Sequence, residues 1–104
     1  MILETKRGDE FAFDFQAFDD ESGLPVDLTG MTITSAVRLR GFLDTLTVTV
    51  IDAPNGEYRL SAPASQTALW PVAKLASDVK FDAGAGHVRR TITFHIEVDE
   101  EVTP

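Results

Sequence analysis

The chain has 104 residues, no cysteine and a formal net charge of −8, and hydrophobic residues make up 43% of it. These values predict a soluble globular protein with one domain over residues 1–104, and they exclude a disulfide framework. They also argue against nonspecific nucleic-acid binding, which needs a basic surface, and no apolar run approaches the roughly 20 residues of a membrane-spanning helix.

The first residues predict a short edge strand, Ile2–Lys6, that leads into a turn. Within this turn, Arg7, Gly8 and Asp9 spell the tripeptide that integrins bind. Three-residue matches arise often by chance, so we interpret these residues as a turn between two strands.

A phenylalanine-rich segment, Phe11–Phe18, alternates apolar and polar side chains, as a strand with one buried face does. Phe11, Phe13 and Phe15 share one face, and we interpret them as core residues rather than as a ligand platform. Phe18 has the opposite parity, so we expect it to cover the sheet edge or to mark a bulge.

The segment Asp19–Gly30 is predicted to be a connection because glycine and proline interrupt it. Its first three residues, Asp19, Asp20 and Glu21, offer the carboxylate oxygens that calcium prefers. Their spacing does not match that of an EF-hand loop, so we interpret them as a solvated turn.

Two alternating segments, Met31–Arg40 and Thr45–Ile51, predict strands separated by a turn at Gly41–Asp44. The outward threonines of the second segment favour a strand, because a branched side chain suits the pleat. The side chains expected in the core are Met31, Ile33, Val37, Leu39, Leu46, Val48 and Val50.

A hairpin is predicted over Thr45–Ser61, because Asp52–Gly56 contains the Asn-Gly pair that closes β-hairpins. Its second strand, Glu57–Ser61, directs Tyr58 and Leu60 inward.

The next segment predicts one helical turn at Ser65–Leu69, which Pro71 must end. Trp70 is the only tryptophan. It could stack on a sugar, but we interpret it as a core anchor for this loop. The strand Lys74–Asp82 follows, with Leu75, Val79 and Phe81 on one face.

The most regular alternation is Thr91–Asp99, in which Ile92, Phe94, Ile96 and Val98 share one face. This pattern predicts a central strand. A strand that starts at Val88 would be about 35 Å long, so we expect a bulge or bend near Arg89 and Arg90. A flexible loop, Ala83–Gly86, precedes it, and Val102–Pro104 is expected to be a tail.

No reaction chemistry is legible in the sequence. The two histidines, His87 and His95, are eight residues apart, which is about 26 Å along a regular strand, so they predict no shared metal site. A nucleophile elbow and a phosphate-binding glycine loop are also missing. We therefore assign no catalytic, cofactor-binding or metal-binding residues, and we expect a non-enzymatic protein without cofactors. Six or seven short strands between turns predict a sandwich or a barrel.

Several motifs follow one another in a recognisable order. They are Lys6-Arg7-Gly8-Asp9, Gly23-Leu24-Pro25-Val26-Asp27-Leu28-Thr29-Gly30, Thr67-Ala68-Leu69-Trp70-Pro71, Ser77-Asp78-Val79 and Val102-Thr103. Their order and spacing resemble those of small immunoglobulin-like β-sandwich modules in structural proteins of tailed bacteriophages and prophages, and the resemblance spans nearly the whole chain. Two positions depart from the pattern: Ala73 stands near a usual glycine, and Leu75 near a usual aromatic residue.

The resemblance implies an immunoglobulin-like antiparallel β-sandwich of about seven strands, with the leucines of residues 23–30 tucked under the sheet. It implies a virion structural protein of the tail, baseplate or fibre, present in the host cytoplasm during assembly. The implied partners are copies of itself and other phage structural proteins, with no nucleic acid and no membrane. The alternative is a carbohydrate- or surface-binding module that uses Trp70 and exposed threonines.

Overall fold

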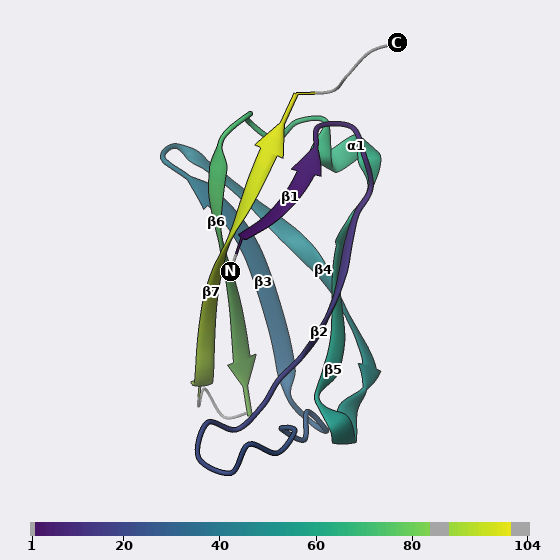
Figure 1. Ribbon diagram of the computed structural model, residues 1–104, viewed down its shortest axis with the longest axis vertical. Coiled ribbons are helices and arrows are strands. Elements are labelled where there is room, and N and C mark those ends of the chain that lie inside the picture. The colour runs from purple at the N-terminus through teal and green to yellow at the C-terminus, as the bar shows by residue number, and fades with distance from the viewer. Residues whose placement is uncertain (1, 84–87, 101–104) are drawn as a thin grey trace.

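The computed structural model describes residues 2–83 and 88–100 of the chain (Figure 1). The described residues form seven strands and two short helical turns. The strands are β1 (Ile2–Lys6), β2 (Phe11–Gln16), β3 (Thr32–Leu39), β4 (Phe42–Asp52), β5 (Glu57–Ala62), β6 (Lys74–Asp82) and β7 (Val88–Asp99), and the helical turns are η1 (Ala53–Asn55) and α1 (Ala64–Thr67).

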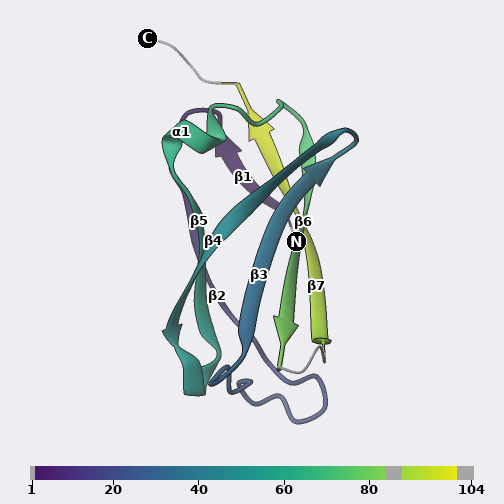
Figure 2. The same ribbon diagram turned by 180° about the vertical axis from the view of Figure 1, so that it is seen from behind.

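All seven strands belong to one sheet, in the order β1-β7-β6-β3-β4-β5-β2. The sheet curls into a nearly closed barrel-like wall around the core (Figures 1 and 2). It is continuous because β4 pairs with β3 through its first half and with β5 through its second half. The all-β prediction and the number of strands are confirmed. The sheet is mixed rather than antiparallel throughout, because β1 pairs with β7 in parallel.

The core is built from the inward faces that the alternation predicts. In β7, Phe94, Ile96 and Val98 are buried, and this strand has neighbours on both sides. Aromatic rings join the two halves of the curled sheet: Phe15 lies 5.4 Å from Phe94, and Tyr58 lies 5.5 Å from Phe81, between ring centroids. Burial of these large apolar surfaces is the main stabilising contribution to the fold.

Three apolar residues expected inside are exposed instead. Leu39, at 38% exposure, pairs with Phe42 beside the β3–β4 turn, where the hairpin stands away from the other strands (Figures 1 and 2). Val50, at 44%, lies where the β4–β5 register shifts. Leu24, at 64%, stays outside, whereas Leu28 is buried as expected. Strand parity predicts the side on which a residue lies, but not where the opposite wall ends.

The predicted β4–β5 hairpin is confirmed, and its turn also holds the long loop before β3. Gly56 has a φ of +74°, and a β-carbon added there would lie 2.7 Å from the Ala17 carbonyl oxygen. The Ala17 amide donates to the Gly56 carbonyl over 2.9 Å, and the Leu28 amide donates to the Ala53 carbonyl over 2.8 Å. Glycine is therefore required at this position by both conformation and space.

The expected irregularity near Arg89 is present in the backbone of β7. Phe81 is paired with Arg90, but the next residue of β6, Asp82, is paired with Val88. One extra residue on β7 is the mark of a β-bulge. The predictions for Gly84–Gly86, His87 and the tail Val102–Pro104 lie outside the described residues.

Candidate interaction surfaces

Trp70 is a core anchor and not a platform for a ligand. Its side chain is fully buried, and its ring centroid lies 5.7 Å from that of Phe11. The indole Nε1 donates to Oδ2 of Asp44 over 2.9 Å, which satisfies the polar end of the ring. The predicted helical turn is confirmed as α1, which ends three residues before Trp70.

The Arg7-Gly8-Asp9 tripeptide is fixed against α1 as a structural turn. Arg7 donates from Nη2 to the Ala68 carbonyl over 3.1 Å. The buried Thr67 hydroxyl donates to the Asp9 carbonyl over 2.7 Å and accepts from the Gly8 amide over 3.2 Å. These bonds position the connection between β1 and β2.

The acidic residues after Phe18 also form a turn. Oδ1 of Asp19 accepts from the amides of Glu21 and Ser22 over 2.8 and 3.0 Å, as in an Asx turn. Phe18 forms an isolated bridge with Pro25, which agrees with its expected place at the sheet edge. Across residues 2–83 and 88–100, no group of three or more histidine or acidic side chains is placed to hold a metal ion.

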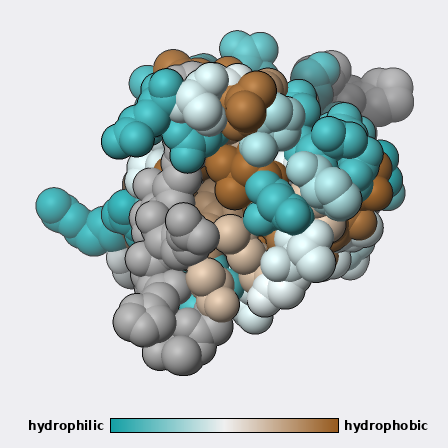
Figure 3. All heavy atoms as spheres, turned by 90° about the horizontal axis from the view of Figure 1, so that it is seen from below, coloured by the Kyte–Doolittle hydropathy of each residue, from teal (hydrophilic) through white to brown (hydrophobic). Residues whose placement is uncertain are grey.

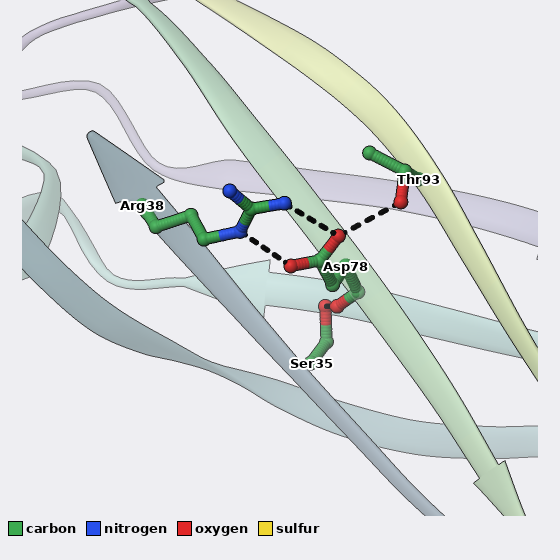
Figure 4. A network of polar contacts seen from close by, with 4 residues as sticks. All are labelled: Ser35, Arg38, Asp78 and Thr93. Carbon is green, nitrogen blue, oxygen red and sulfur yellow. Dashed lines mark hydrogen bonds and ion pairs between the residues drawn. The ribbon is translucent and has the colours of Figure 1, made fainter. Parts of the chain in front are cut away.

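On the outer face of the sheet, a polar network joins three neighbouring strands (Figure 4). Arg38 of β3 donates from Nε to Asp78 of β6 over 2.7 Å, and Thr93 of β7 donates to the same carboxylate over 2.8 Å. From the buried side of β3, Ser35 donates to the backbone carbonyl of Asp78 over 2.8 Å. The hydrogen bond from Arg38 lowers the pKa of the Asp78 carboxyl below its ordinary value.

A basic groove of about 450 Å³ lies beside this network, at the turn end of β3. Positively charged side chains gather in this groove, although the chain as a whole has a net charge of −8. His95 lies in this groove, so the structure places it on the outer face of the sheet. The lining residues are Arg38, Leu39, Arg40, Lys74, Ala76 and His95.

An acidic groove of about 360 Å³ runs along the seam of the barrel, between β1 and β2. These two strands are the edges of the sheet, and in the described part of the chain each has one neighbour. An unpaired strand edge can accept a further strand. The groove is lined by Glu4, Thr5, Lys6, Asp9, Glu10, Ala12, Phe13 and Asp99.

A hollow of about 720 Å³ opens at the end of the barrel that carries the β2–β3 loop. Figure 3 views this end and shows apolar atoms in a recess with polar atoms on part of its edge. The apolar lining includes Ala17, Leu24, Val26, Met31 and Phe81, and the acidic lining is Asp19, Asp20, Glu21 and Asp27.

Sequence reasoning missed these three surfaces. Strands distant in sequence form the two grooves, and the hollow depends on how the β2–β3 loop is placed next to Phe81. Arg38 and Arg40 share outward parity, which was a visible signal for part of the basic groove. Lys74 joins them only through the pairing of β3 with β6.

Within the described residues, no helix is long and apolar enough to cross a membrane.

Among solved structures, the fold is similar to that of the N-terminal domain of phage TP901-1 ORF48. The TM-score is 0.61 at 21% sequence identity, and the match covers 95% of this chain and 85% of the other. No family model matches the sequence, and no curated protein matches it. At this level of identity, the similarity establishes a shared fold.

Proposed function

We propose that this chain is a non-enzymatic structural protein of a tailed-phage or prophage particle, in the tail, baseplate or fibre. The observation that carries the proposal is the fold shared with a phage protein domain over 95% of the chain. The sequence motifs support it independently, because their order resembles that of phage structural modules.

The proposed mode of action is assembly through protein surfaces. The chain offers two open strand edges, three grooves or hollows and nine exposed large apolar side chains on its described surface. Exposed apolar area and open edges are features of proteins that bind other proteins. The partners are copies of the chain and other phage structural proteins, and the site of action is the virion.

An immunoglobulin-like arrangement is part of the proposal. In that fold one layer contains strands B, E and D, and the other contains C, F and G. Here β2, β5 and the second half of β4 form one wall, and β3, β6 and β7 form the other, with β1 added beside β7. The connected β4 joins the two walls into one sheet.

A particle-composition experiment tests this function. Particles released after induction of a strain that carries the gene are purified on a density gradient and analysed by mass spectrometry. The chain is expected in the particle fraction, and deletion of its gene is expected to give particles with an incomplete or missing tail part. Intact, infectious particles that lack the chain would contradict the proposal.

The carbohydrate-binding alternative has lost its main candidate residue, because Trp70 is fully buried. Thr45, Thr47 and Thr49 are exposed on β4, as predicted. A single row of threonines is explained by strand propensity and does not define a sugar site.

A further inference from the structure

The two ends of the barrel have complementary shapes. The β3–β4 hairpin projects to the side near one end, and the β2–β3 loop lies at the opposite end (Figures 1 and 2). The residues of this loop line most of the hollow. The molecule is elongated, with extents of 46 × 27 × 22 Å, so these features are far apart on one copy. They can therefore meet only between copies.

The hairpin tip is a basic and apolar projection. Leu43 is 71% exposed and Leu39 is 38% exposed, while Arg40 is exposed between them. Gly41, with a φ of +77°, makes the turn tight. Lys74 adds further positive charge beside the tip, whereas the charge of Arg38 is paired with that of Asp78. Leucine side chains held this far out in water favour contact with another apolar surface.

The hollow at the other end has the matching chemistry. Its volume of about 720 Å³ lies within the roughly 300–1,000 Å³ of pockets that enclose a ligand. Apolar side chains, including those of Met31, Val26 and Phe81, line it. Four carboxylates, those of Asp19, Asp20, Glu21 and Asp27, also line it. An apolar floor with acidic groups fits an apolar side chain flanked by a cation.

We propose that the β3–β4 hairpin tip of one copy docks into the end hollow of a second copy. The inference rests on the proposed structural role, and it names the partner as the same chain. In this contact Leu43 and Leu39 enter the apolar hollow, and Arg40 faces the carboxylates. Glu21 is the carboxylate to substitute, because those of Asp19 and Asp27 accept hydrogen bonds within the loop. Electrostatic complementarity of this kind fixes the orientation of an interface.

Because the two docking surfaces differ, each copy contacts one neighbour through its hairpin tip and another neighbour through its hollow. Such heterologous contacts produce a ring when the rotation closes and an open row when it does not. Copies that each carry a charge of −8 repel one another at long range, and this repulsion is screened at physiological salt, where the Debye length is about 8 Å. Association is therefore expected at an ionic strength of about 0.15 M.

Sedimentation and light scattering of the full chain test the proposal, at concentrations from about 10 µM to about 1 mM. The average mass is expected to rise with concentration past that of a dimer. Arg40→Glu and Glu21→Arg are each expected to weaken association about tenfold or more, because each places like charges at the contact. Circular dichroism and thermal unfolding verify that both variants fold.

Mixing the two variants is the decisive step. The hairpin tip of the Arg40→Glu variant then meets the hollow of the Glu21→Arg variant, so the two opposite charges are exchanged and the attraction returns. The mixture is therefore expected to associate more strongly than either variant alone.

Leu43→Ser is expected to weaken association. Leu69→Ser is the matched control, because Leu69 is 77% exposed and lies outside the hairpin. Lys80→Glu is the control for a change in net charge.

Several outcomes would overturn the inference: a monomer throughout this range, a species that stops at a dimer, unchanged association in either charge variant, or no recovery in the mixture. The particle-composition experiment is independent of these outcomes. If the chain is found in particles but is monomeric in solution, only the proposed contact between copies is contradicted. If the chain self-associates but is absent from particles, the proposed structural role is contradicted.

Discussion

The indole Nε1 of Trp70 donates to Oδ2 of Asp44 over 2.9 Å, across 26 residues of sequence. This bond joins the loop after α1 to the start of β4, and it allows a tryptophan to be fully buried without an unsatisfied N–H group.

We expect Asp44→Ala to destabilise the protein by about 1–3 kcal/mol, because the buried indole N–H loses its partner. Asp44→Asn retains an oxygen acceptor and should cost less. Chemical denaturation followed by tryptophan fluorescence measures both changes. Equal stability of the alanine variant and the parent would show that this bond contributes nothing measurable.

Gly56→Ala is expected to be much more harmful than Gly41→Ala. Both glycines have a positive φ, so each substitution introduces backbone strain of about 1–2 kcal/mol. At Gly56 the new β-carbon would also lie 2.7 and 2.8 Å from two carbonyl oxygens, whereas at Gly41 nothing lies within 4 Å. The difference in unfolding free energy between the two variants measures this close approach, and similar values would contradict it.

Two buried serines should respond in opposite ways to removal of the hydroxyl group. The Ser77 hydroxyl is fully buried and has no hydrogen-bond partner in the described structure, so Ser77→Ala is expected to be neutral or stabilising. Ser35 donates to the Asp78 carbonyl, so Ser35→Ala should cost about 1 kcal/mol. Thermal unfolding of both variants tests the pair, and a large loss for Ser77→Ala would reveal an unseen partner.

Stability should fall in acid partly through Asp78. Its pKa is lowered in the folded state by the hydrogen bond from Arg38, so ionised Asp78 stabilises the fold above the unfolded pKa of about 3.9. This contribution is lost as the pH falls below that value and through the folded pKa. Unfolding free energies measured from neutral pH to below about pH 4 should therefore show a shallower acid decline in Asp78→Asn than in the parent chain. An identical slope would indicate that other carboxylates account for the decline.

Most strands of the sheet could be predicted from the sequence, because period-two alternation is a local signal. It gave β1 and β6 with their observed bounds and the inward faces of β2 and β7. The parallel pairing of β1 with β7 could not be predicted, because it joins residues at opposite ends of the chain. The buried Ser77 has the correct inward parity, but its polar side chain gave no signal of burial.

The candidate surfaces were less predictable than the strands. The hollow depends on how far the β2–β3 loop stands away from Phe81, which no local pattern records. The basic groove requires the β3–β6 register, which places Arg38 opposite Ala76. Both are properties of pairing between distant segments, whereas Trp70 was correctly interpreted because its size and its single occurrence favour a core position.

The parallel pairing of β1 with β7 also determines how the protein bears mechanical load. Five residue pairs, from Ile2 with His95 to Lys6 with Asp99, connect the first strand to the last. When the two ends of the chain are pulled in opposite directions, the force runs along both strands and loads these pairs together in shear. The pairs must then break at once rather than one after another, so the terminal strands form a clamp against stretching.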